Sequence, residues 1–281
     1  MPIKTAFVTE NVIRNASLPN HGGKYVTVQH GFVIDQTKAE LLNAGFTINQ
    51  ELYKTSADGQ MAQGIYHLNY GNDADMGLMF AWSNSYNKMM RFKCAVGAHV
   101  FICSNGVVNG DMGNYKRKHI GNTALSDVTN TIQSQISQAK EHYDKLVEDK
   151  EMLKNIILTP RDKGRILGEL FAKDEILTLT QVGIVKREMD KPTHAYNADV
   201  NSAWSMYNHI TFALKESHPM TYLDDHKKVH TFFVNEYGQL ITPQIQGEPI
   251  VSSNFDVDQQ TEQDFVNDDI EVDCTFGVNF L

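Results

Sequence analysis

The sequence predicts an α+β fold, an antiparallel sheet covered by helices, because its strand-like and helix-like segments are segregated along the chain. Residues 1–123 contain short aromatic and β-branched runs separated by glycine, asparagine and aspartate. Residues 124–243 carry apolar residues at steps of three and four, which is typical of amphipathic helices. We therefore expect a β-rich core, 1–123, and a helical part, 124–243, packed on it as one compact unit. Residues 244–281 are acidic and polar, which predicts a disordered tail.

The first half is expected to hold one helix among its strands. Residues 37–44 have helical composition and end before Gly45, a common helix terminator. Strands are expected at residues 25–28, 31–34, 64–70, 76–83, 89–103, 106–109 and 115–120. Because Gly97 lies inside the longest of these segments, we expect a bend or a β-bulge there.

The second half begins with apolar residues that recur at helical spacing from Leu125 to Ile157, which predicts one long amphipathic helix. Thr159 followed by Pro160 is typical of an N-cap and a first helical position. These two residues are expected to open a second helix that runs through Phe171. Further helices are expected over residues 176–189 and 201–214.

The formal net charge of −9 is concentrated at the end of the chain. Residues 1–120 carry a net charge of +3, residues 121–245 carry −3, and residues 246–281 carry −9 with no basic residue. Because the part without the tail is neutral, the total charge does not exclude a nucleic-acid partner. Three cysteines are too few for a disulfide framework, and neither a signal peptide nor a membrane span is recognisable. We therefore expect a cytoplasmic protein.

Two residue pairs suggest chemistry but also have simpler structural interpretations. Cys103 and His119 would supply a nucleophile and its base, yet Cys103 ends an apolar strand and is expected to be a buried hydrophobic residue. Asp73 and Asp75 offer oxygen ligands for Mg²⁺. Their glycine and asparagine neighbours favour a solvated turn between two strands instead.

His226 and His230 would share one face of a helix and could bind a metal ion. The lysines between them, Lys227 and Lys228, favour a solvated basic surface. No nucleotide-binding loop, dinucleotide fingerprint or zinc-protease motif is present in the sequence. We therefore expect no catalytic residues, no metal and no cofactor.

The densest mixture of cations and aromatic rings lies between residues 82 and 119. Such mixtures hold single-stranded nucleic acid, because cations neutralise phosphates while aromatic faces stack on bases at about 1–3 kcal/mol per base. The expected phosphate contacts are Arg91, Lys93, Lys116, Arg117 and Lys118, with His119 beside them, and the expected stacking residues are Trp82, Tyr86 and Tyr115. Strand alternation places Phe92 opposite Arg91 and Lys93. A core-facing Phe92 with cations on a solvated outer face is an equally good interpretation.

Two separated segments resemble those of the phage/plasmid-like protein family of unknown function. The first comprises Asn84-Ser85, Arg91-Phe92-Lys93-Cys94, Cys103-Ser104-Asn105-Gly106 and Lys118-His119, and the second is Trp204-Ser205-Met206-Tyr207-Asn208 with Thr211. The resemblance covers roughly residues 60–230, and the pairing of two separate motifs makes it fairly specific.

The resemblance implies a role in phage or plasmid DNA replication or recombination, and a distant relation to phage single-strand annealing proteins. Those proteins have a curved antiparallel sheet packed on a long helix, and an oligomeric ring or filament holds one DNA strand without catalytic residues. The acidic tail with its apolar end is similar to the tails of single-strand DNA-binding proteins. That similarity implies a replication or recombination protein as a partner of residues 256–281.

The sequence thus predicts a homo-oligomeric, non-enzymatic protein that binds single-stranded DNA and promotes annealing. The alternative is a protein-interaction module, for example an anti-defence or host-takeover factor that acts through its acidic surface. A hydrolase or transferase that uses Cys103 and His119 is the third hypothesis.

Overall fold

A computed structural model describes residues 5–21, 26–102, 105–108, 113–114 and 123–238 of the 281-residue chain. All of these residues belong to the first of two compact units, Met1–Thr242. The expected acidic tail, the expected strand at 115–120 and the Cys103–His119 pair lie outside the described residues.

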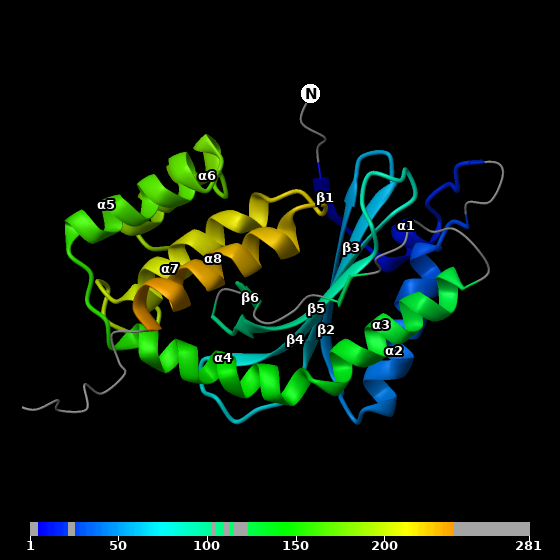
Figure 1. Ribbon diagram of the computed structural model, residues 1–281, viewed down its shortest axis with the longest axis horizontal. Helices are drawn as coiled ribbons and strands as arrows, with labels where there is room; N and C mark the ends of the chain where they lie inside the picture. The colour runs from blue at the N-terminus through cyan, green and yellow to red at the C-terminus, as the bar shows by residue number, and fades with distance from the viewer. Residues whose placement is uncertain (1–4, 22–25, 103–104, 109–112, 115–122, 239–281) are drawn as a thin grey trace, which may run out of the picture. The chain divides into compact units, whose positions relative to one another are not determined.

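The strands form an antiparallel meander (Figure 1). They are β1 (Thr5–Val8), β2 (Ile48–Ser56), β3 (Met61–Leu68), β4 (Met76–Ser85), β5 (Lys93–Val100), β6 (Gly106–Val108) and β7 (Gly113–Asn114). Their order in the sheet follows the chain from β1 to β6, and β7 pairs with the start of β5. The antiparallel sheet and the helices that follow it confirm the predicted α+β class. The curvature that the resemblance implies stays a prediction.

One face of the sheet carries the main core. Side chains from β3, β4 and β5, including Tyr66, Phe80 and Val96, pack in one large cluster to which most of the helices contribute, three of them along this face. These helices are α2 (His30–Asn43), α3 (Ala124–Ser137) and α4 (Ala139–Lys154), which lie along this face in Figure 1. A short helix, α1 (Glu10–Arg14), adds Ile13 to the same cluster.

The other face of the sheet, which we call the second face, has a smaller apolar cluster. Ile65, Met79, Ala81, Ala95 and Val108 pack there against Tyr222 and Leu223 of α8 (Tyr222–Tyr237). The remaining helices are α5 (Pro160–Gly168), the π-helix η1 (Glu169–Lys173), α6 (Leu179–Asp190), α7 (Ala203–Ala213) and the 3₁₀ turn η2 (Leu214–Glu216). α7 contacts both α4 and α6. Because α4 and α8 contact strands of the sheet, they join the helical part to it.

The predicted strand at residues 31–34 is wrong, because these residues form the first turn of α2. Val33 and Ile34 are β-branched, which suggested a strand. They are buried together with Thr37 and Leu41, and this spacing is helical. The predicted helix over 37–44 is the second half of the same element. Residues 26–28 form no regular element, whereas β2 was not predicted.

The predicted long helix from Leu125 to Ile157 is divided into α3 and α4 at Gln138. Apolar spacing continues across this break through Ile136, Ala139 and Tyr143, so periodicity does not reveal it. The hydroxyl of Ser137 donates to the carbonyl of Ser134 at 2.9 Å, a local bond of the kind that competes with helix continuation. The predicted helices at 159–171, 176–189 and 201–214 are confirmed with shifted ends, and α8 was not predicted.

The predicted strand 89–103 is shorter than expected, because Met89–Phe92 belong to the turn that joins β4 to β5. Lys88 has a φ of +64° in this turn, a conformation that ends an extended strand. The expected bulge at Gly97 is wrong, since the pairing of β4 with β5 is regular through Gly97 and Met79.

Candidate nucleic-acid interface

The two described cations of the predicted site lie at the start of β5. Arg91 is exposed in the β4–β5 turn, and Phe92 beside it is fully buried in the main core. Lys93 is the first residue of β5, and its ammonium group forms an ion pair with the carboxylate of Asp224 on α8. The alternation of side chains is therefore as predicted. Lys93, however, bridges two elements and does not merely solvate the surface.

Trp82 and Tyr86 do not fit the role that the sequence suggested, because both rings are buried in the core. Trp82 shares its sheet face with Phe80, and its indole N–H donates to the Tyr66 hydroxyl at 3.1 Å. The Tyr86 ring stacks on His30 with centroids 3.7 Å apart, and its hydroxyl accepts the His30 backbone N–H at 2.7 Å. Neither ring is available to a nucleic-acid base.

The remaining predicted residues, Tyr115, Lys116, Arg117, Lys118 and His119, lie outside the described residues. The two residues that precede Tyr115 in the sequence are described. Asn114 of β7 pairs with Lys93, and Gly113 pairs with Cys94. Asn114, two positions before Lys116 in the sequence, is thus next to Lys93, which in turn is two positions from Arg91.

A row of polar side chains crosses the second face from Lys54 on β2 to Lys93 on β5, with Gln63 and Ser83 between them. Lys54 is only 5% exposed, and it donates to the carbonyls of Lys215 and Ser217 at 2.9 and 2.7 Å. Burial lowers the pKa of Lys54 from its ordinary value, although Glu216 opposes this shift. We call these four residues the polar row. Sequence reasoning missed it because strand register, which brings the four together, is invisible in the chain.

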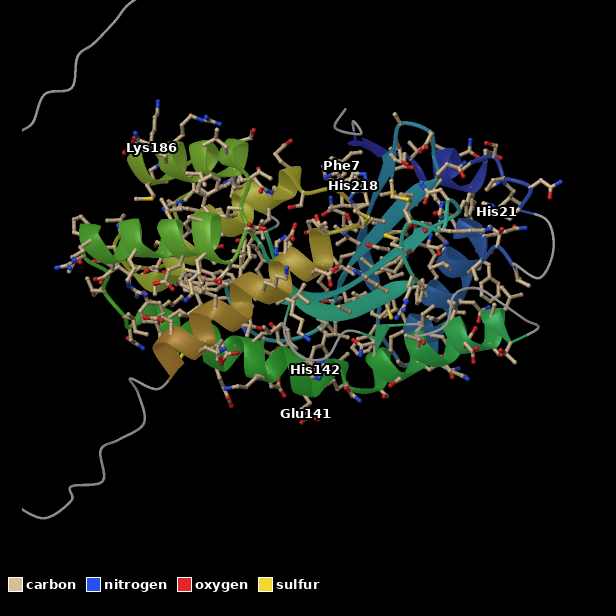
Figure 2. The ribbon with its side chains drawn as sticks, turned by 45° about the horizontal axis from the view of Figure 1, so that its top comes forward. Phe7, His21, Glu141, His142, Lys186 and His218 are labelled. Atoms are coloured by element: carbon tan, nitrogen blue, oxygen red, sulfur yellow. The ribbon has the colours of Figure 1, made fainter. Side chains whose placement is uncertain are left out.

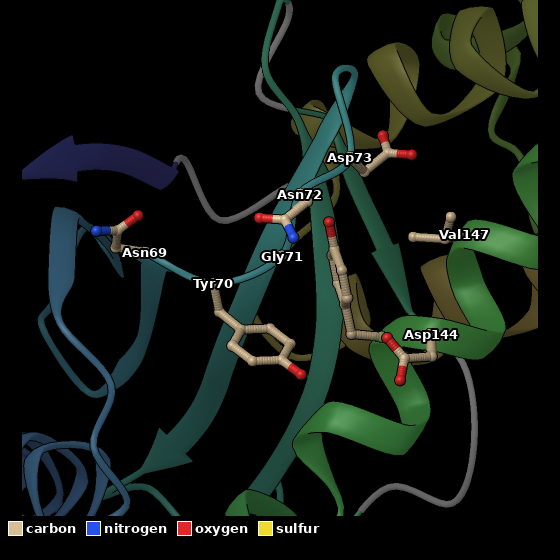
Figure 3. Close-up of a pocket in the computed structure, with 8 residues that line it drawn as sticks. Asn69, Tyr70, Gly71, Asn72, Asp73, Asp144 and Val147 are labelled. Carbon is tan, nitrogen blue, oxygen red and sulfur yellow. The ribbon is translucent and has the colours of Figure 1, made fainter.

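An open pocket of about 790 Å³ lies at the opposite end of the sheet, between the β3–β4 loop and α4 (Figure 3). Tyr70 projects into this space towards the side of Asp144. The backbone of Gly71 has a φ of +93° and packs directly against the ring of Tyr143, so a Cβ there would collide with that ring. Two carboxylates, Asp73 and Asp144, line the pocket, which makes it a poor place for a phosphate.

Asp73 and Asp75 lie in the turn that the sequence predicted between two strands, but the turn is not solvated at these residues, because their side chains are only 11% and 15% exposed. Asp73 accepts the backbone N–H groups of Asp75 and Met76, each at 2.9 Å. The two carboxylates bind Lys150 and Lys154 of α4, each at 2.5 Å. Within the described ranges, no group of three or more histidine, cysteine, aspartate or glutamate residues has the arrangement of a metal site.

His226 and His230 do not lie on a solvated basic surface, so that prediction is wrong. Their exposures are 0% and 2%, because this face of α8 packs inward. Burial lowers the pKa of His226 to about 3. His230 meets the carboxylate of Asp149 on α4 at 3.1 Å.

Residues 27–231 match the family described as a domain of unknown function (DUF932). The chain belongs to this family. Searches of curated proteins and of solved structures find no match. The DUF932 match includes the polar row and the β4–β5 turn, and it ends within α8. In the described part of the chain, no helix is both long and apolar enough to cross a bilayer.

Proposed function

We propose that this DUF932 protein binds single-stranded DNA without catalysing a reaction, and promotes strand annealing in phage or plasmid replication or recombination. The binding surface is the end of the sheet formed by the β4–β5 turn and the start of β5. Arg91, Lys93 and the cations at 116–118 contact phosphates, with His119 beside them, and Tyr115 stacks on a base. The protein acts as a homo-oligomer in the cytoplasm, and residues 256–281 recruit a replication or recombination protein.

The cations at the start of β5, and the strand pairing that brings Asn114 beside them, support this proposal. Arg91 in the β4–β5 turn lies two positions before Lys93, the first residue of β5, and Lys93 pairs with Asn114, which precedes Lys116, Arg117 and Lys118 in the sequence. Phosphate binding requires such a local concentration of positive charge, even in a protein whose total charge is negative. Met89, 64% exposed in the same turn, offers an apolar contact for a base.

Titration of a fluorescent single strand against salt tests the proposal. We expect binding that weakens linearly with the logarithm of salt concentration, because cations of the protein displace counterions. Replacing Arg91, Lys116, Arg117 and Lys118 with alanine should lower the affinity. It should also reduce the salt slope by about 0.7 for each phosphate that the variant no longer neutralises.

The matched control removes two cations from a different surface. Lys186 and Arg187 are exposed on α6, and Figure 2 shows Lys186 pointing away from the rest of the molecule. Lys186→Ala with Arg187→Ala should leave affinity and salt slope unchanged. Absence of binding at low salt by protein without residues 246–281, or equal losses of affinity in both sets of variants, would contradict the proposal.

A further inference from the structure

The polar row is a continuous line of paired residues. Lys54 pairs with Gln63, Gln63 with Ser83, and Ser83 with Lys93, so the four side chains stand side by side across four strands. Neighbouring strands are about 4.8 Å apart, which places adjacent members of the row within reach of one bound group. The adjoining position on each strand of this face is apolar, as Ile65, Ala81 and Ala95 show.

The two central members of the row have unmet hydrogen-bonding capacity. Gln63 and Ser83 are each 1% exposed. Among the described residues, neither the amide nitrogen and oxygen of Gln63 nor the hydroxyl of Ser83 has a hydrogen-bond partner. Buried polar groups of folded proteins are nearly always paired, because an unpaired group loses its bonds to water without replacement. The row therefore has hydrogen bonds to offer to a group that enters it.

Both ends of the row are held by the same segment, residues 215–224. Lys54 donates to the carbonyls of Lys215 and Ser217, and Lys93 is paired with Asp224. The Lys54 end is closed, whereas the side chains at the other end, Lys93 and Asp224, are 20% and 31% exposed. The Lys93 end, where Arg91 and the β4–β5 turn lie, is thus the more accessible one, and a ligand that reached Gln63 and Ser83 would have to displace part of the covering segment, because both are 1% exposed. A phosphate that approached Lys93 would compete with the carboxylate of Asp224.

The unpaired atoms of Gln63 and Ser83 determine which chemical group could bind to the row. A bare oxyanion would leave the Gln63 carbonyl unpaired, because that carbonyl needs a donor while the amide nitrogen and the Ser83 hydroxyl can donate. A nucleobase edge carries a donor beside an acceptor and pairs with a glutamine amide through two bonds. We propose that Gln63 and Ser83 bind one base of the DNA strand whose phosphates lie at Arg91 and Lys93. This inference rests on the proposed function.

Stability measurements test the unpaired state of the row without DNA. Gln63→Met keeps the size of the side chain and removes both unpaired atoms, so we expect the melting temperature to rise by about 2–4 °C. Ser83→Ala removes a smaller polar group, and we expect it also to raise the melting temperature. The control is Gln50→Met on the exposed part of β2, which should leave the melting temperature unchanged. A fall in melting temperature for both row variants would overturn the inference, because it would mean that the polar groups are satisfied structurally.

Binding measurements test the ligand. Oligodeoxythymidylate is compared with a strand of equal length made of abasic units, which has phosphates but no bases. Wild-type protein should prefer the base-containing strand by about tenfold, and Gln63→Met and Ser83→Ala should lose most of this preference while they keep the salt slope. Gln50→Met should behave as wild type.

Failure of this inference is distinguishable from failure of the proposed function. If wild-type protein binds both strands equally, DNA binding stands and the base site is wrong. If it binds neither strand, the proposed function is wrong and the base site is wrong with it. If the row variants keep the full preference for bases, the bases are bound elsewhere and the inference is overturned.

Discussion

Among single residues, Asp149 of α4 is a buried carboxylate with two charged or titratable partners. Its side chain is 4% exposed and its two oxygens meet Lys145 and His230, each at 3.1 Å. Burial opposes the charged form, but the bonds to His230 and Lys145 bring the pKa of Asp149 below its ordinary value. Because His230 is buried and would lose this carboxylate partner, Asp149→Ala should lower the free energy of unfolding by about 3–5 kcal/mol in urea titrations. Asp144→Ala, on the exposed side of the same helix, should cost less than about 0.5 kcal/mol, and equal effects would contradict this account.

Residue types and nearness in sequence did not separate the surface residues of the predicted site from its core residues. Charged side chains seldom enter a core, so Arg91 and Lys93 were expected outside it. Arg91 is exposed, and Lys93 forms an ion pair with Asp224. Trp82 and Tyr86 were assigned to the same surface because they are close to these cations in sequence. Trp82 follows Leu78 and Phe80 at steps of two, and this alternation indicates the core face of β4. The period of the strand was better evidence than nearness in the chain.

Helix capping is the feature of individual elements that the sequence predicts best. Thr159 accepts the backbone N–H of Asp162, and Asp162 in turn accepts the backbone N–H of Thr159 at 2.9 Å. Thr159→Ala should therefore lower the free energy of unfolding by about 1 kcal/mol, measured by urea denaturation. Thr123 supplies the control, because it precedes α3 without making a side-chain cap bond. Thr123→Ala should change the stability by no more than a few tenths of a kcal/mol, and a comparable loss there would argue against the cap as the cause.

Element boundaries were predicted well where a local signal marks them and poorly where tertiary contacts decide. The Thr-Pro signal located the start of α5, and glycine and aspartate located the turn between β3 and β4. Val33 and Ile34 are β-branched and favour a strand. They nevertheless lie in α2, where both are buried on the side that packs on the core. The polar row has no local signal at all, since the partner of Lys93, Asp224, is 131 residues away in the chain. Register and long-range pairing are properties of the assembled sheet.

At the scale of the whole molecule, five of the buried histidines among the described residues make stability depend on pH. Burial lowers the pKa of His30, His67 and His226 to about 3 and that of His99 and His209 to about 4. In the unfolded chain these groups titrate near 6.5. The unfolded state therefore binds more protons between about pH 6.5 and 4, and acid favours unfolding in that range. Their contribution to stability is complete above about pH 6.5 and is lost as the pH falls towards the folded pKa values.

The urea midpoint should accordingly be nearly constant at and above about pH 7.5 and fall steeply by about pH 5.5, because each histidine that stays neutral in the fold costs up to about 1.4 kcal/mol per pH unit. The stacked pair His67 and His99, with ring centroids 3.7 Å apart, supplies two of the five. Replacing both with glutamine removes their proton uptake on unfolding, so the variant's midpoint should fall less steeply with acid than that of the wild type. A wild-type midpoint that stayed level or rose between these pH values would mean that the histidines are protonated in the folded protein, which is incompatible with their burial.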